Sequence, residues 1–458
     1  MRTSFLSDDT ICAVATPTGM GAIATVRVSG PQAHAIVCGL FQHKGEPFEM
    51  SRIEGYRAYY GQIADATTTL DEAVVTFFKA PHSFTGDDAA EISVHGSLFI
   101  QQRLLELLIE RGARLAQPGE FTRRAFVNRK FDLAQAEAVA DLIASQNQAA
   151  HRLAMNQLKG GFSEELQVMR SKLLEITSLI ELELDFSEED VEFADRSRLK
   201  ALVADTQRHV SALVDSFRLG NAIKNGIPVA IVGETNTGKS TLLNALLGEE
   251  RAIVSDIAGT TRDTIEEVLN LGGLLFRFID TAGIRETTET IEKIGIERTY
   301  RKIGEANIVL GVLDATQTPQ ALQKAVDDIA LHVDRNRQTL LVLLNKTDLG
   351  HTDVDADLCI SAKTGEGLDL LRVRLVEAGR RLTDTQNAVL VTNLRHYEAL
   401  KHAGESLQAV QRGLDEGIPT DLVAQDLREA LYYLGSITGE ITTDEVLGSI
   451  FSRFCIGK

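Results

Sequence analysis

A glycine-rich stretch between an apolar run and a helical run carries the clearest chemical signal in the sequence. Residues 233–240 read Gly-x-x-x-x-Gly-Lys-Ser, after the apolar run 229–232 and before the helical run 241–247. Such glycines let backbone N–H groups surround a phosphate, and the positive end of the following helix adds to the attraction. Lys239 can reach the β- and γ-phosphates, and the Ser240 hydroxyl can bind Mg²⁺. The alternative is a glycine-rich turn before a helix, but the context on both sides favours a nucleoside triphosphate site.

Two downstream motifs have residue types suited to Mg²⁺ and a γ-phosphate. Residues 255–263 (SDIAGTTRD) stand where a switch loop is expected, and Thr260 or Thr261 could supply a second hydroxyl to Mg²⁺. Residues 280–283 (DTAG) follow an apolar strand; the aspartate can hold Mg²⁺ through water, and the glycine N–H can contact the γ-phosphate. The next residue is Ile284, where Ras-like proteins carry a glutamine that orients the attacking water. Hydrolysis is therefore slow, or another group positions the water, and an arginine finger or an extra cation is expected.

The nucleotide base is predicted from two further motifs. Asn345-Lys-Thr-Asp348 follows an apolar strand, and the carboxylate of Asp348 can accept two N–H groups of guanine that adenine does not offer. Residues 361–363 (SAK) would support the base, so GTP is preferred over ATP. The residues expected to contact GTP are Asn236, Thr237, Gly238, Lys239, Ser240, Thr241, Ser255, Asp256, Ile257, Ala258, Gly259, Thr260, Thr261, Asp280, Thr281, Ala282, Gly283, Asn345, Lys346, Asp348, Ser361, Ala362 and Lys363.

Composition places these motifs in an ordinary globular chain. The chain has 458 residues, of which 44% are hydrophobic, and a net charge of −18 that argues against non-specific coating of nucleic acid. The sequence has no run of about 18 apolar residues, so no membrane span is predicted. Charged residues interrupt the first ten residues too soon for the apolar region of a signal peptide. The four cysteines do not have the spacing of a metal site. A reducing, cytoplasmic setting is expected.

Hydrophobic periodicity divides the chain into four segments. Residues 1–128 read as mixed α+β, and 129–223 as long helices. Residues 224–384 alternate strands and helices, which predicts a Ras-like P-loop α/β domain with a mainly parallel sheet. Residues 385–458 are helical again. The expected fold is therefore a multidomain α/β and α protein, in which the P-loop domain is inserted into one discontinuous helical domain.

Several local features allow more than one interpretation. EISVHGS (91–97) and QPGEFTRRAF (117–126) are expected to be turns and helix entries. Arg123, Arg124, Arg129 and Lys130 could form a local basic patch, although a solvated helix face is the more common explanation. The acidic residues 181–193 could be an exposed loop or an electrostatic contact surface, and we favour the loop.

Blocks outside the nucleotide motifs make the chain resemble a known family. These are ATPTGMGAIATVRVSG, SFTGDDAAEISVHG, PGEFTRRAFVNRKFDLAQAEAVADLI and the terminal FCIGK, together with DIAGTTRD and DTAGIRE in the GTPase domain. Over essentially its whole length the chain resembles the MnmE (TrmE) family of bacterial and organellar tRNA-modification GTPases. GTPase motifs alone would fit many families, whereas the flanking blocks would not.

The resemblance implies an N-terminal domain that dimerises and binds 5-formyl-tetrahydrofolate or a related one-carbon folate. The matching folate-binding positions are Arg27, Glu91, Lys130 and the terminal Lys458. Cations and a carboxylate suit the glutamate tail and the pterin donors of a folate. Without the resemblance, ordinary surface ion pairs would be the better interpretation. Cys455 opens the terminal CIGK motif and is either a reactive thiol or a packing residue.

The resemblance also implies a potassium ion beside the phosphates, in place of an arginine finger. Its ligands would be Asn236, Ser255, Ile257 and Thr260, while Ser240 and Thr261 would bind Mg²⁺. The family often has proline where this chain has Thr235, but Asn236 is retained. The catalytic glutamate that orients water falls on Glu292; a solvated helix residue is the alternative.

The function implied is K⁺-dependent GTP hydrolysis by a homodimer that drives tRNA wobble-uridine modification. With an FAD-containing partner (MnmG, also GidA), in a heterotetramer, such an enzyme adds an aminomethyl-type group to C5 of the uridine. The carbon would come from the folate and the nitrogen from glycine or ammonium. The rival hypothesis is a regulatory GTPase that binds ribosomal RNA or an assembly partner and needs no folate site.

Overall fold

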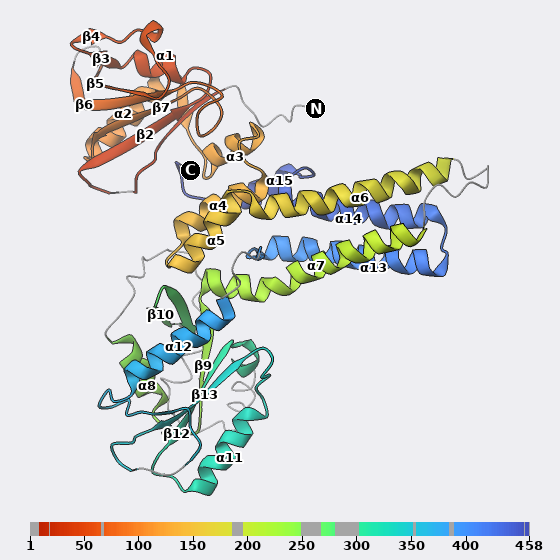
Figure 1. Ribbon diagram of the computed structural model, residues 1–458. Helices are drawn as coiled ribbons and strands as arrows, with labels where there is room; N and C mark the ends of the chain where they lie inside the picture. The colour runs from red at the N-terminus through yellow and green to blue at the C-terminus, as the bar shows by residue number, and fades with distance from the viewer. Residues whose placement is uncertain are drawn as a thin grey trace. The chain divides into compact units, whose positions relative to one another are not determined.

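The computed structural model describes residues 9–17, 19–65, 68–185, 196–248, 267–279, 302–350, 354–383, 389–452 and 454–457. These residues form two compact units. One unit contains the described residues up to Ala140, Gln157–Ser171 and the described residues from Leu431 onward; the other contains Asp141–Asn156 and Lys172–Ala430. Figure 1 shows a β-rich N-terminal part, long helices, and an α/β part, which confirms the predicted fold class. The limits 1–128, 129–223, 224–384 and 385–458 stay predictions.

An eight-stranded sheet forms the centre of the N-terminal part, in the order β4-β3-β5-β6-β7-β2-β1-β8. Neighbouring strands are antiparallel except β1 and β8, which pair in parallel. The strands are β1 (Thr10–Val14), β2 (Ile23–Ser29), β3 (Phe41–His43), β4 (Glu46–Pro47), β5 (Arg57–Ala64), β6 (Thr69–Phe78), β7 (Ala89–His95) and β8 (Ala113–Leu115). Alternate side chains of β2, β6 and β7, such as Val26, Val75 and Ile92, are fully buried. Helices α1 (Ala33–Cys38) and α2 (Leu98–Glu110) supply the rest of this core.

Strand β7 contradicts the expectation that residues 91–97 are a turn or a helix entry. It lies between β2 and β6 and forms ladders with both. Ala90, Ile92 and Val94 are buried, whereas the side chains between them are polar. The period-two pattern of a strand with one buried face was therefore present, but it is short and ends at glycine.

A buried ion cluster explains why the predicted basic patch is only partly exposed. Arg124, on α3 (Glu120–Val127), is 5% exposed, and its Nη2 donates to Asp9 Oδ1 at 2.8 Å. Glu120 is 2% exposed and accepts from Arg114 and from the backbone N–H of Gln117. Arg129 and Lys130 are exposed. The solvated-face interpretation is thus wrong for Arg124, because Asp9 and Glu120 hold its charge in the interior.

Replacing Glu120 with glutamine is expected to destabilise the N-terminal part by about 3 kcal/mol, because two guanidinium groups lose a buried counter-charge. Burial raises the pKa of Glu120, but Arg114 and the Gln117 N–H outweigh it and hold the pKa below its ordinary value. Stability from this carboxylate is therefore fully present above the pKa of the unfolded state and is lost as the pH falls through the lower pKa of the folded state. In thermal unfolding, the difference in stability between the wild type and Glu120→Gln should become smaller below about pH 4.5. Glu106→Gln, an exposed position on α2, is the control; equal effects of both variants would contradict the role of the cluster.

Long helices follow the sheet and return after the α/β part. They are α4 (Leu133–Ala144), α5 (Gln148–Leu158), α6 (Gly161–Asp185), α7 (Arg196–Asn225), α13 (Leu394–Glu416), α14 (Thr420–Thr438) and α15 (Asp444–Phe451). Helices α4 and α5 are separate, because Asn147 Oδ1 accepts a hydrogen bond from Ala150 N–H and caps the start of α5. α6 extends to Asp185, so the acidic segment begins as helix rather than loop. No helix among these residues is both long and apolar enough to cross a bilayer.

The α/β part has a six-stranded sheet in the order β10-β11-β9-β12-β13-β14. All neighbours are parallel except the hairpin β10–β11. Its elements are β9 (Ile227–Val232), α8 (Lys239–Leu247), β10 (Glu267–Leu271), β11 (Leu274–Phe278), β12 (Ile308–Asp314), α11 (Pro319–Ala330), β13 (Thr339–Asn345), β14 (Leu358–Cys359) and α12 (Leu368–Thr383). Strand β10 was missing from the prediction.

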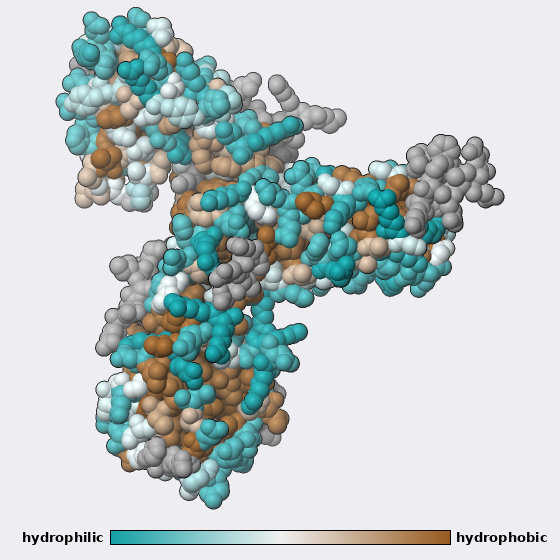
Figure 2. Space-filling model, in the orientation of Figure 1, coloured by the Kyte–Doolittle hydropathy of each residue, from teal (hydrophilic) through white to brown (hydrophobic). Residues whose placement is uncertain are grey.

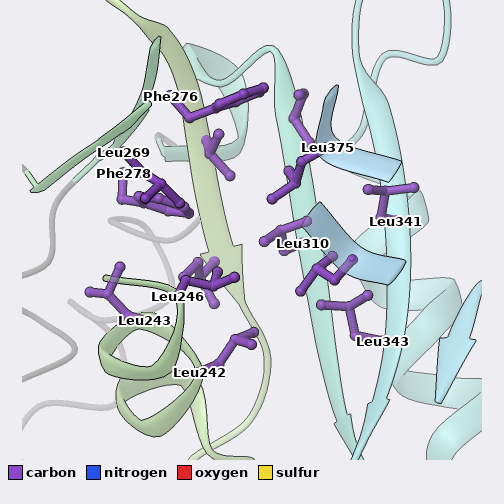
Figure 3. Packing of buried hydrophobic residues seen from close by; sticks show 14 of the residues in the cluster. Leu242, Leu243, Leu246, Leu269, Phe276, Phe278, Leu310, Leu341, Leu343 and Leu375 are labelled. Carbon is purple, nitrogen blue, oxygen red and sulfur yellow. The ribbon is translucent and has the colours of Figure 1, made fainter. Parts of the chain in front are cut away.

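Both faces of this sheet are covered. Leu242, Leu243 and Leu246 of α8 and Leu375 of α12 pack on one face, as Figure 3 shows. The alternate residues of β9 and β12 pack on the other face against residues such as Ile303 and Val333. Burial on both faces explains the continuous apolar runs of these strands. In the view of Figure 2 the long helices show mainly hydrophilic side chains with isolated hydrophobic ones.

The chain enters and leaves the α/β part at neighbouring points. Helix α7 ends one residue before β9 begins, and the segment before α13 returns across α7. The hydroxyl of Ser216 accepts a hydrogen bond from Val391 N–H at 3.1 Å. A Cβ added at Gly220 would lie 2.1 Å from the Val391 carbonyl oxygen. This crossing therefore requires a residue without a side chain.

Gly220→Ala is expected to destabilise this unit by about 2 kcal/mol, because overpacking forces the backbone apart. Gly404→Ala, on the paired helix α13, is the matched control, since its Cβ would make only ordinary contacts at 3.5 and 3.6 Å. There the gain in helix propensity should leave stability unchanged or raised by up to about 1 kcal/mol. Thermal unfolding of both variants tests whether the close approach of Val391 to α7 requires glycine. A Gly220→Ala variant with unchanged stability would contradict this requirement.

Candidate functional site

The glycine-rich loop joins the buried strand β9 to helix α8, as its spacing predicts. Gly233 (φ 150°) and Gly238 (φ 94°) both have positive φ angles. A Cβ at Gly233 would lie 2.2 Å from the Val312 carbonyl oxygen, and one at Gly238 would lie 2.3 Å from Asn345 Nδ2. Only glycine fits both the backbone angles and the space. Because α8 begins at Lys239, the loop ends at a helix N-terminus suited to an anion.

The side chain of Lys239 folds back over this loop. Its Nζ donates to the carbonyl oxygens of Gly233 at 3.0 Å and Glu234 at 2.6 Å. Burial, followed by repulsion from Lys302, lowers the pKa of Lys239. The ammonium group is thus placed among the loop carbonyls, where an incoming phosphate would meet it and favour its charged form.

Asn345 fastens the loop to the expected base-recognition motif. It stands at the carboxyl end of β13 and is 2% exposed. Its Nδ2 donates to the Thr237 carbonyl oxygen at 2.8 Å, and its Oδ1 accepts from Ala362 N–H at 2.9 Å. One side chain therefore connects three motifs that lie up to 125 residues apart in the sequence (237 to 362).

Asp348 is exposed and oriented by a buried serine. The Ser361 hydroxyl, which is fully buried, donates to Asp348 Oδ1 at 2.7 Å. This hydrogen bond holds one oxygen of the carboxylate in place, and the lone pairs that remain on the two oxygens can accept from two guanine N–H groups. Lys363 is exposed beside Ala362.

Asp314 belongs to this site although the sequence interpretation did not include it. At the end of β12 its Oδ2 accepts from Lys346 Nζ at 2.6 Å. Burial raises the pKa of Asp314, but Lys346 and Thr316 outweigh that effect and lower it. The signal was an acidic residue at the carboxyl end of an apolar strand, where ligands of parallel sheets bind.

The remaining predicted nucleotide residues divide into two groups. Asn236 and Thr241 are exposed, and Ser240 is half-buried in the first turn of α8. Asn236 has a left-handed backbone with φ 63°. The following predicted residues lie outside the described part of the chain: Ser255, Asp256, Ile257, Ala258, Gly259, Thr260, Thr261, Asp280, Thr281, Ala282, Gly283, Glu292 and Lys458.

A second cluster lies in the N-terminal part, where Arg27 and Glu91 face each other across β2 and β7. Arg27 donates from Nε and Nη2 to Glu91 Oε1 at 2.9 and 2.7 Å. The guanidinium lies over the rings of Phe84 and Phe121, 5.1 and 5.6 Å from their centroids. The two aromatic residues stand inside SFTGDD and PGEFTRR, the quoted motifs, but were not predicted as site residues.

The C-terminal segment reaches the same cluster. Arg27 Nη1 donates to the Gly457 carbonyl oxygen at 3.4 Å, and Gly119 N–H donates to the Cys455 carbonyl oxygen at 3.4 Å. A Cβ at Gly457 would lie 2.4 Å from the Val14 carbonyl oxygen, so the segment lies directly against β1. The Cys455 side chain is exposed. Two predicted site residues, Arg27 and Glu91, thus lie together beside the CIGK motif.

Lys130 joins this cluster only indirectly. Its Nζ donates to the Pro81 carbonyl oxygen at 3.1 Å. The next residue, Phe131, packs edge-on against Phe84, with ring centroids 5.9 Å apart. The aromatic ring of Phe84 therefore lies between the loop that carries Lys130 and the Arg27 guanidinium.

A six-stranded sheet with a glycine-rich loop, an Asn-Lys-Thr-Asp motif and a buried serine under the aspartate defines a P-loop GTPase. Two family descriptions match the chain: "GTP-binding protein TrmE N-terminus" over residues 10–130 and "MnmE helical domain" over residues 133–455. The chain belongs to the MnmE (TrmE) family of tRNA modification GTPases.

Individual relatives agree with this assignment. The chain is 51% identical to the tRNA modification GTPase MnmE of Bacteroides thetaiotaomicron, covering 99% of this chain and 100% of that protein. It is 50% identical to the protein of the same name from Porphyromonas gingivalis, covering 98% of each. Among solved structures, the FeoB G-domain of Methanococcus jannaschii matches with 24% identity and a TM-score of 0.25, over 34% of this chain and 97% of that chain.

Proposed function

We propose that this GTPase modifies the wobble uridine of tRNA with a folate one-carbon donor and an FAD-containing partner, MnmG. The observation that carries the proposal is the Arg27–Glu91 cluster beside the C-terminal segment. A regulatory GTPase that only switches between nucleotide states has no need of such a cluster. The adduct would be an aminomethyl-type group at C5, with glycine or ammonium as the source of nitrogen.

The cluster offers the groups that a folate requires. Arg27 is 17% exposed and Glu91 32% exposed, so both retain an accessible edge while they hold each other. Phe84 and Phe121 support the guanidinium by cation–π contact and keep it in place. The carboxylate of Glu91 can accept from the N–H groups of a pterin, and cations such as Arg27, Lys130 and Lys458 can pair with the folate's glutamate tail.

Calorimetry with 5-formyl-tetrahydrofolate and the full-length chain tests this proposal. Wild-type protein should bind, and Arg27→Ala should weaken binding at least tenfold, because a hydrogen-bonded charge contributes about 1.5–3 kcal/mol. Arg57→Ala is the control, since Arg57 is exposed on β5 and pairs only locally with Glu54. Absence of binding by wild-type protein would favour the rival hypothesis of a regulatory GTPase. Wobble-uridine analysis of tRNA from cells lacking the protein would test the modification itself.

GTP hydrolysis in this proposal depends on Mg²⁺ and K⁺. Ser240, at the start of α8, has the hydroxyl and the position to bind Mg²⁺, with Thr261 as the second hydroxyl. Asn236 is exposed on the loop and held in a left-handed conformation, so its side chain projects from the phosphate-binding turn. Together with Ser255, Ile257 and Thr260 it would bind K⁺, and Glu292 would orient the water. Equal turnover in sodium and potassium salts would contradict the role of Asn236.

An exposed apolar patch supports a homodimer. It consists of Met20, Ile23, Leu98 and Phe99, which are 54–85% exposed. Gly21 N–H donates to the Gly96 carbonyl oxygen, so the turn before β2 and the start of α2 adjoin. A contiguous apolar surface of this kind favours association with a second copy. Phe99→Asp should shift the sedimentation of the full-length protein from dimer to monomer.

A further inference from the structure

A cavity of about 310 Å³ lies in the second unit. It adjoins the β10–β11 turn, near the start of β9, whereas the glycine-rich loop follows the end of β9. Its walls are the β10–β11 turn, the first turns of α5 and the last turn of α12. The lining residues used in the argument below are Gln148, Arg152, Gly272, Gly273, Arg380 and Thr383. No described residue of the nucleotide and folate sites discussed above lines it.

The described charged residues of this cavity are cationic. Among the residues that the structure describes, Arg152 and Arg380 are the ionisable ones that line it, and neither forms an ion pair. The remaining polar side chains, Gln148 and Thr383, are uncharged. In a chain with a net charge of −18, a cavity whose charged residues, as far as the structure describes them, are two arginines is unusual.

Helix α5 adds to this potential. Its N-terminal residues Gln148 and Ala149 line the cavity, so the positive end of the helix dipole faces the same space as the arginines.

The wall opposite α5 is a two-residue turn of glycines. Leu271 pairs with Leu274 in the register of the hairpin, so Gly272 and Gly273 form the turn, with φ angles of 58° and 81°. A Cβ at Gly272 would lie 3.0 Å from Val376 Cγ1, and one at Gly273 would lie 3.3 Å from Gln148 Oε1. The turn thus fits closely between two helices and exposes backbone rather than side chains.

We propose that this cavity binds a phosphate group, carried either by the backbone of an RNA or by a free phosphate compound. Two guanidinium groups and a helix N-terminus match a phosphate, because arginine can donate two parallel hydrogen bonds to its oxygens. The volume exceeds that of one phosphate and leaves space for an attached sugar. The described lining includes no aromatic side chain for base stacking, so binding would be independent of sequence. The RNA source rests on the proposed tRNA function; the phosphate chemistry does not.

Both experiments use full-length protein saturated with GDP, so that the nucleotide site is occupied. In the first, the protein is titrated into fluorescently labelled tRNA. In the second, pyrophosphate is titrated into the protein in a calorimeter. The variants are Arg152→Ala and Arg380→Ala. Arg381→Ala is the matched control, because it removes the same charge from the adjacent exposed position of α12, outside the cavity. Basal GTP hydrolysis should be equal in all variants and verifies folding.

If RNA is the source, each cavity variant should weaken tRNA binding about tenfold and lower the slope of log affinity against log salt by about one, whereas Arg381→Ala should do neither. If a free phosphate compound is the source, the cavity variants should lose pyrophosphate binding while tRNA binding is unchanged. Variants that match Arg381→Ala in both titrations would overturn the proposal. Wild-type protein that binds pyrophosphate in the cavity but no tRNA would retain the phosphate site and contradict the proposed tRNA function.

Discussion

Replacing Asp348 with asparagine is expected to lower the affinity for GTP about 100-fold and to create binding of xanthosine triphosphate. The carboxylate accepts two N–H groups of guanine, and each such charged hydrogen bond contributes about 1.5–3 kcal/mol. An amide at the same position keeps one acceptor but places a donor against the second of those N–H groups, whereas xanthine offers that donor a carbonyl oxygen. Ser361 would still hold the side chain in place. Fluorescent-nucleotide titration with GTP and xanthosine triphosphate measures the exchange of specificity.

Asp355→Asn is the control for this experiment, since Asp355 is an exposed acid shortly after the same motif. It should leave both affinities unchanged. An Asp348→Asn protein that still prefers GTP would show that the base lies elsewhere, and it would remove the argument that Ser361 and Asn345 organise a guanine site.

Lys239→Ala is expected to reduce kcat/KM for GTP by about 100-fold or more, because removing one charged donor from developing phosphate charge costs two to three orders of magnitude. Lys324→Ala, an exposed lysine on α11, is the control and should behave as wild type. The pH dependence gives a second measurement. Burial and Lys302 lower the pKa of Lys239 in the free protein, and phosphate raises it again, so binding takes up a proton.

GTP affinity of the wild type should therefore fall as the pH rises towards the lowered pKa, at a lower pH than an ordinary lysine would require. This decline should be absent in Lys239→Ala. A variant with the same pH profile as the wild type would mean that another group titrates and that the Lys239 ammonium does not meet the phosphates.

The sequence was sufficient to predict those parts of the site whose residues are close together along the chain. The loop from Gly233 to Ser240 needs a strand before it and a helix after it, and both are read directly from local periodicity. The parallel strands were predicted from their apolar runs, whereas their order in the sheet was not predicted. Strand β10 was missed because it is an edge strand and its Val268 and Asn270 are only half-buried, so no apolar run marks it.

What the sequence could not provide is pairing over long separations. Arg124 and Asp9 are 115 residues apart, and Arg27 and Gly457 are 430 residues apart. Nothing local distinguishes a buried arginine from a solvated one. The bonds of Asn345 to both Thr237 and Ala362 likewise depend on the sheet that brings three loops to one edge.

The direct passage from α7 into β9 makes the helix a lever. Only Gly226, with φ 96°, separates Asn225 from Ile227, and a Cβ there would lie 3.2 Å from Arg277 Cβ. The 30 residues of α7 span about 45 Å. A rotation of about 10° at Gly226 would thus displace the far end of the helix by about 8 Å. Because β9 leads into the glycine-rich loop and its six residues span about 20 Å, a displacement at the loop would be roughly doubled at the far end of α7.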